Sequence, residues 1–125
     1  MKKIFFIAFV LILSLTKAKA QSFNYIFSIN GVDVYGRWSC DDCSDRHYSY
    51  KITNNNPYRI KWSYDKFMWI NSNGTVEKTE SGGSWWLPAN STQNAGSSGL
   101  WFYPPNTVYG KNLRPEFKNF NVIKD

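Results

Sequence analysis

Apolar and polar side chains alternate with a period of two along most of the chain after residue 20. The stretch 23–29, FNYIFSI, has an aromatic or aliphatic side chain at every second position, and 32–38, VDVYGRW, follows after Asn30-Gly31. This period is typical of β-strands, because successive side chains of a strand point to opposite faces of the sheet. We therefore predict strands at 23–29 and 32–38, joined by a tight turn.

Two further alternating runs predict a β-hairpin. They are HYSYKI at 47–52 and YRIKWSY at 58–64, and the turn-forming residues TNNNP lie between them. The apolar run KFMWI at 66–70 either extends the second strand or begins another. Additional strands are expected at 75–80, whose charges suit the edge of a sheet, and at 81–88 after a glycine hinge, at 100–105 and at 117–123, with Phe120 and Val122 facing inward.

Turn-forming residues recur along the chain at the spacing that is typical of short antiparallel strands. We predict an all-β fold: a single antiparallel β-sandwich of seven to eight short strands, immunoglobulin-like or fibronectin-like in general architecture. True immunoglobulin domains have cysteines far apart in sequence, whereas Cys40 and Cys43 lie together after Trp38. A sandwich fold by itself implies no function.

Residues 1–20 have the pattern of a secretory signal peptide. Lys2 and Lys3 precede an apolar run from Ile4 to Leu15, and the small-residue site Ala18-Lys19-Ala20 follows. A helix of about 12 residues rises only about 18 Å, too short for a hydrocarbon core of about 30 Å. We therefore expect a secreted or periplasmic protein whose mature part, 21–125, is one domain without a membrane span.

Removal of the signal peptide changes the charge of the protein. The whole chain has a formal net charge of +6, but residues 21–125 retain 11 basic and 9 acidic residues. The remaining cations are scattered singly, whereas a nucleic-acid-binding surface requires a dense stripe of Lys and Arg. No nucleic-acid partner is expected.

The stretch RWSCDDCSDRHYSY contains both cysteines and the one histidine of the chain. In an exported protein, Cys40 and Cys43 are expected to form a small disulfide, which stabilises the fold by only about 2 kcal/mol. A redox centre would need a helix directly after the motif, and the following residues alternate as a strand. Zinc would need a fourth ligand besides the two cysteines and His47. Calcium binding by Asp41, Asp42 and Asp45 is the third alternative, but a solvated loop is the simpler interpretation of these acids.

No set of residues suggests catalysis, so we expect neither an enzyme nor a cofactor or metal site. Excess aromatic residues instead suggest binding, and Trp85, Trp86 and Trp101 form the candidate ligand platform. The expected partner is a glycan or a protein at the cell envelope or outside the cell, and the sequence does not rank the two or predict an oligomeric state. The alternatives are an inhibitor or accessory subunit of another exported protein, and a thiol redox enzyme that uses Cys40 and Cys43.

Overall fold

The computed structural model describes residues 22–94, 100–105 and 110–125, so the predicted signal peptide lies outside the described residues. No helix in the described ranges is long and apolar enough to cross a membrane. The described residues form nine strands: β1 (Asn24–Ile29), β2 (Val32–Trp38), β3 (Tyr48–Asn54), β4 (Ile60–Asn71), β5 (Val76–Leu87), β6 (Thr92–Asn94), β7 (Trp101–Phe102), β8 (Leu113–Lys118) and β9 (Asn121–Lys124).

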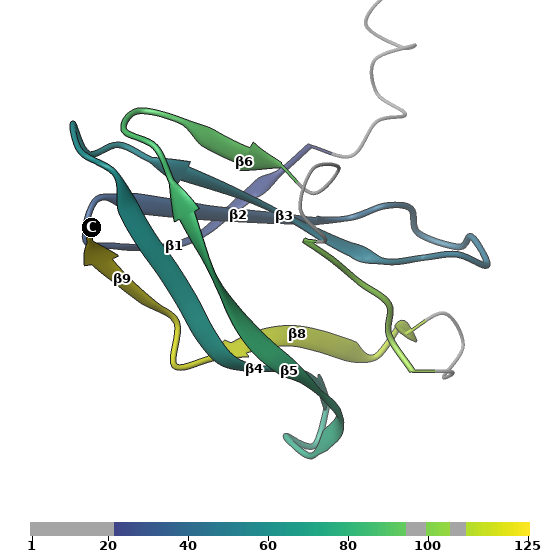
Figure 1. Cartoon of the computed structure of the whole chain (residues 1–125). Coiled ribbons are helices and arrows are strands. Elements are labelled where there is room, and N and C mark those ends of the chain that lie inside the picture. The colour runs from purple at the N-terminus through teal and green to yellow at the C-terminus, as the bar shows by residue number, and fades with distance from the viewer. Residues whose placement is uncertain (1–21, 95–99, 106–109) are drawn as a thin grey trace, which may run out of the picture.

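These strands form two antiparallel sheets that pack as a sandwich (Figure 1). Sheet A has the order β1-β2-β3-β6, and β7 also pairs with β3. Sheet B has the order β5-β4-β8, and β9 also pairs with β4. The predicted fold class, a single antiparallel β-sandwich, is confirmed. The short strand β6 and the beginning of β8 lie outside the strands that the sequence predicted.

The predicted hairpin of 47–52 and 58–64 is wrong. β3 belongs to sheet A and β4 to sheet B, so the asparagine-rich turn carries the chain from one sheet to the other. Alternation does not distinguish the two arrangements, because a strand buries one face whether its successor pairs with it or packs across from it. Instead, β4 pairs with β5 along its length. The apolar run 66–70 therefore belongs to β4, and β5 is continuous across the predicted glycine hinge. β5 is an edge strand of sheet B, as its charges predicted.

A β-bulge in β1 places the apolar side chains before it and after it on opposite faces of sheet A. The register with β2 shifts between Tyr25 and Phe27. A bulge inserts one extra residue and so reverses the facing of the positions beyond it. Phe27 and Ile29 pack against the core, whereas Tyr25 is 60% exposed on the outer face. The prediction that these three side chains share one face was therefore wrong.

The core between the sheets consists mainly of aromatic rings. Trp62 stacks on Trp85 at 4.5 Å between ring centroids, and Phe67 stacks on Phe102 at 3.8 Å. Such rings bury large apolar areas, so a small sandwich obtains a core from few residues. Val122 is buried and Phe120 packs against the core, as the sequence predicted. The largest fully buried side chains are Trp62, Trp69, Tyr50, Phe67, Ile52, Ile60, Leu100, Val32, Val34 and Asn54.

Candidate functional site

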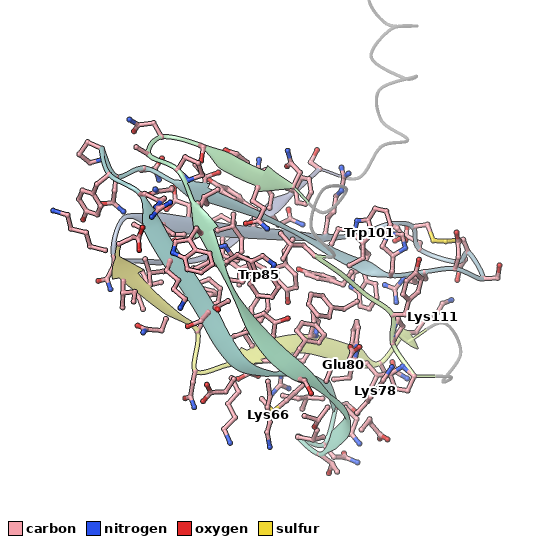
Figure 2. The ribbon with its side chains drawn as sticks, viewed as in Figure 1. Lys66, Lys78, Glu80, Trp85, Trp101 and Lys111 are labelled. Carbon is pink, nitrogen blue, oxygen red and sulfur yellow. A yellow bond between two sulfur atoms is a disulfide. The ribbon has the colours of Figure 1, made fainter. Side chains whose placement is uncertain are left out.

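The three tryptophans of the predicted platform lie in three different environments. Trp85 faces inward from β5, where its ring stacks on Trp62 and packs against the core. Trp86 follows it in the same strand and is 54% exposed on the outside of sheet B. Trp101 lies in β7 of sheet A and is 47% exposed (Figure 2). Adjacent residues of a strand face opposite sides, and the two sheets present opposite outer faces, so the three rings do not form one platform.

Trp86 belongs to a small polar and aromatic cluster at the C-terminal end of the described chain. The Lys61 ammonium lies 5.0 Å from the ring centroid of Trp86, and Trp86 Nε1 donates a hydrogen bond of 3.2 Å to the Asp125 carboxylate. Asp125 also forms an ion pair with Arg59. These contacts hold the Trp86 ring against its own chain.

Trp101 lies in a cluster of three rings on the outside of sheet A. The His47 ring centroid is 5.6 Å from that of Trp101 and 5.2 Å from that of Tyr103, which is 50% exposed. His47 Nδ1 lies 3.0 Å from the Asp45 carbonyl oxygen. His47 is half-buried, because the two larger rings pack against it.

Strand register extends this cluster into a broader surface. Arg37, Ser49 and Trp101 are direct neighbours across β2, β3 and β7, so their side chains form one row on the outer face. Ser49 faces outward but is only 5% exposed, because the longer side chains of Arg37 and Trp101 flank it on both sides. The adjacent row runs across β1, β2, β3 and β6 and consists of Tyr25, Tyr35, Lys51 and Asn94.

We call this surface the sheet A face. The Lys51 ammonium lies 4.5 Å from the ring centroid of Tyr35, whose ring meets that of Tyr25 edge-on at 6.0 Å. The Arg37 guanidinium lies 4.1 Å from the ring centroid of Phe23. The sheet A face is defined by Phe23, Tyr25, Tyr35, Arg37, His47, Ser49, Lys51, Asn94, Trp101 and Tyr103.

Two clefts lie away from the sheet A face. One has a small volume, and the polar groups of the other already form hydrogen bonds within the protein. One, of about 250 Å³, opens between the edges of β1 and β8 and is lined partly by Phe27 and Phe117. The other, of about 310 Å³, lies at the end of the sandwich beside Asn30, Asn56 and Tyr58. Its amides bond to the protein, because Asn56 donates to the Asn30 carbonyl and Asn30 donates to the Val122 carbonyl. Small-molecule pockets usually have volumes of about 300–1,000 Å³, so the first cleft lies below this range and the second at its lower end.

Cys40 and Cys43 form a disulfide at the tip of the β2–β3 hairpin. Arg46 closes the loop, because its Nε donates a hydrogen bond of 2.9 Å to the Cys40 carbonyl and its guanidinium lies 3.6 Å from the Trp38 ring centroid. The loop carboxylate of Asp42 forms an ion pair with Lys111. The chain then enters β3 and not a helix, which is the geometry of a structural clip.

Within the described ranges, one group of three side chains has the spacing of a metal site. It consists of Cys40, Cys43 and Asp45, with ligand atoms within 4.8 Å of one another. Metal binding by cysteine requires the thiolate, and both sulfurs of this group are bonded to each other in the disulfide. While the disulfide is formed, Asp45 is therefore the one residue of this group that can bind a metal ion.

The shifted pKa values in the described part of the chain follow mainly from burial. Burial raises the pKa of Tyr50 well above 10.0 and also raises that of Tyr48. The pKa of Tyr64 is raised by burial and secondarily by the negative charge of Glu80. Burial lowers the pKa of Arg46, and the charges of the nearby aspartates partly oppose this shift. These groups belong to the core and to the hairpin tip and not to the sheet A face.

Two buried polar residues were missed by the sequence interpretation. The Asn54 amide, fully buried, donates to the carbonyls of Tyr58, Leu87 and Pro88. Gln93 Oε1 accepts a hydrogen bond of 3.0 Å from Trp62 Nε1. Asn54 continues the inward alternation of β3 directly after Ile52, so its inward direction was visible in the sequence, but its partners were not.

No family model and no curated protein matches the chain. A solved structure with a similar fold is the crystal structure of a DUF1425 family member from Shewanella sp. pv-4, with a TM-score of 0.51 and 20% sequence identity. The similarity covers 85% of this chain and 94% of that one. At this identity the likeness concerns the fold alone, and it shows that this chain shares the β-sandwich architecture of that DUF1425 family member.

Proposed function

We propose that the mature chain, residues 21–125, is an exported binding protein that recognises a saccharide on the sheet A face. The observation that carries this proposal is the exposure of Tyr25, Trp101 and Tyr103, at 60%, 47% and 50%, on the outside of one sheet. Exposed aromatic rings that gather on one face usually mark a binding surface. The carbon-bound hydrogens of a sugar ring stack on such faces.

The polar groups between the rings also suit a saccharide. Arg37 lies in the same row as Trp101, and Lys51 lies beside Asn94 in the next row. Cationic groups donate hydrogen bonds, and an amide group both donates and accepts them. Sugar hydroxyls require both functions, so the face combines stacking surface with partners for the polar rim of a sugar.

Binding is favoured over catalysis because the carboxylates of the described residues act mainly as structural partners. Asp33 accepts hydrogen bonds from Ser28 and from Asn55. Asp65 accepts a hydrogen bond of 2.6 Å from Asn119 on the far side of the molecule. The disulfide clip and its position before a strand argue against the thiol redox alternative.

The test is saccharide binding by the exported chain and by two tryptophan variants. On a glycan array and by calorimetry, Trp101→Ala should weaken binding about tenfold or more, because stacked anchors of this kind carry most of an interface's affinity. Trp86→Ala is the matched control: it removes an equally exposed ring from sheet B and should leave binding within about twofold.

Two results would overturn this proposal. One is no saccharide binding on the array by the folded protein, and the other is equal binding by Trp101→Ala and the unmodified chain. A defined exported protein that binds in place of a saccharide would instead support the inhibitor or accessory-subunit alternative.

A further inference from the structure

Two lysines are direct neighbours on the outer face of sheet B. Lys66 of β4 pairs with Lys118 of β8 on one side and with Ser81 of β5 on the other. The residue after Lys66, Phe67, is fully buried, so Lys66 and its two partners face outward, and Figure 2 shows Lys66 directed away from sheet A. Such neighbours have Cβ atoms about 4.5–5.5 Å apart, and like charges at this spacing destabilise a sheet.

The acidic residues beside this lysine pair have other partners. Within the ranges that the structure describes, no ion pair includes either lysine. Glu116 forms an ion pair with Arg114, and the Asp65 carboxylate accepts a hydrogen bond from Asn119. Both lysines are exposed, so the pair presents its positive charge to the solvent.

A third lysine and two apolar side chains form another row of the same face. Lys61 of β4 pairs with Ile123 of β9 and with Trp86 of β5. Ile123 is 52% and Trp86 54% exposed. Lys61 and Lys66 are five residues apart in one strand, so the cations extend over about 17 Å. We call this surface the sheet B face, and it consists of Lys61, Ser63, Lys66, Met68, Thr79, Ser81, Ser84, Trp86, Glu116, Lys118, Asn121 and Ile123.

From these rows we propose that the sheet B face docks the protein on an anionic lipid bilayer. Anionic headgroups attract clustered lysines, and the charge of the lysine pair is complementary to them. Trp86 and Ile123 add apolar area that the boundary between headgroups and acyl chains can bury. The exposed aliphatic side chain of Ile123 favours a lipid over a sugar, because it offers no hydrogen bond and no ring for stacking.

Docking through sheet B is compatible with saccharide binding on the opposite side of the sandwich. The two sheets present opposite outer faces, so a protein that lies on a bilayer through the sheet B face directs the sheet A face away from it. The two surfaces share no residue. The lipid surface is therefore a second partner and not a substitute for the saccharide.

The test is cosedimentation of the exported chain with lipid vesicles. Vesicles of phosphatidylcholine with about 30 mol % phosphatidylglycerol should bind the chain at low salt, and vesicles of phosphatidylcholine alone should bind it about tenfold or more weakly. Binding to the anionic vesicles should be lost when the salt concentration rises from about 0.05 to 0.5 M, because salt screens exposed charges.

Charge-removing variants assign the binding to the lysine pair. Lys66→Gln and Lys118→Gln should each lower the affinity for the anionic vesicles about fivefold. Lys78→Gln is the matched control, because this lysine is also exposed but pairs with the buried Trp69 and so faces the other side of sheet B. It should bind within about twofold of the unmodified chain.

Tryptophan quenching by brominated acyl chains tests which face lies on the bilayer. Trp86→Phe should remove most of the quenching that the unmodified chain shows on anionic vesicles. Trp101→Phe is the control, because it removes a similarly exposed ring from sheet A, and it should retain the quenching.

Several results would overturn the proposal. They are no binding of the folded chain to the anionic vesicles, equal weakening by Lys66→Gln and Lys78→Gln, and quenching that persists in Trp86→Phe. Binding of polyglutamate without binding of vesicles would also overturn it and would indicate an acidic protein partner. Each of these results leaves saccharide binding by the sheet A face unaffected.

Discussion

At the scale of single residues, Asn54 holds one end of the sandwich together. It is fully buried, and its amide nitrogen contacts three backbone carbonyls, those of Tyr58, Leu87 and Pro88. Its Oδ1 accepts a hydrogen bond of 3.0 Å from the Asn56 backbone. These bonds tie the end of β3 in sheet A to the start of β4 and the end of β5 in sheet B. One side chain thereby stabilises the connection from β3 in sheet A to β4 in sheet B, where the sequence predicted a hairpin.

Asn54→Ala is expected to lower the free energy of unfolding by about 3 kcal/mol, because buried carbonyls lose their donor and a backbone amide loses its acceptor. Urea unfolding followed by tryptophan fluorescence measures the change. The control is Asn55→Ala, which removes an exposed hydrogen bond to Asp33 and should cost less than about 0.5 kcal/mol. Equal stability of the two variants would contradict this role of Asn54.

Tyr50 makes stability depend on alkaline pH. Burial raises its pKa well above the ordinary value of 10.0 in the folded protein. The folded state therefore holds this proton more tightly than the unfolded state does. Its contribution is fully present below pH 10, the unfolded pKa, and is lost as the pH rises toward the folded pKa. In urea titrations, the free energy of unfolding of Tyr50→Phe should fall less than that of the unmodified chain between about pH 9 and 11. If the two free energies fall in parallel with pH, this role of Tyr50 is contradicted.

At the scale of elements, the pairing of β4 with β5 depends on a glycine where the two backbones approach closely. A Cβ atom at Gly82 would lie 1.9 Å from the Tyr64 carbonyl oxygen and 2.5 Å from that of Asp65. The two strands can therefore approach here only without a side chain at this position. The sequence interpretation treated the glycines as a hinge between separate strands, whereas β5 runs through them as one strand, with Gly82 close to the backbone of β4.

Gly82→Ala is expected to destabilise the fold by about 2 to 3 kcal/mol, because the new methyl group meets backbone atoms that cannot rotate away. Chemical unfolding of the variant gives the value directly. Ser84→Ala, two residues along the same strand and exposed, should change stability by less than about 0.5 kcal/mol. A Gly82→Ala variant as stable as this control would show that β5 is not held as described.

At the scale of the whole molecule, the two sheets present different outer faces. The exposed ring of Trp86 on sheet B contacts Lys61 and Asp125, whereas sheet A gathers several rings and cations in register. The disulfide lies at the tip of the β2–β3 hairpin of the same sheet. We propose that this arrangement operates outside the cytoplasm, as the pattern of residues 1–20 suggests.

Intact mass spectrometry of the exported protein tests this proposal. The mass should correspond to a chain that begins at Gln21, and alkylating reagents should modify Cys40 and Cys43 only after reduction. Retention of residues 1–20 would contradict export through a cleaved signal peptide. Rapid alkylation without reductant would show that the clip is open in the native protein.

The strands themselves follow largely from the sequence. Tyr50 and Ile52 lie in the core and Lys51 lies outside because their alternation leaves one way to bury the apolar side of β3. The proximity of Cys40 and Cys43 similarly predicts a local clip, because residues three apart in a turn come within bonding reach without any distant contact. These features depend on neighbours along the chain, and a linear pattern contains that information.

The binding face and the assignment of strands to sheets depend on contacts between residues far apart in the chain. The aromatic excess predicted a platform, but the sequence does not state that Trp85 joins the core or that Trp101 lies in the same row as Arg37. The bulge that turns Tyr25 outward is likewise set by its pairing with β2. A period of two determines which side chains of a strand share a face, whereas long-range pairing decides which strands place those faces side by side.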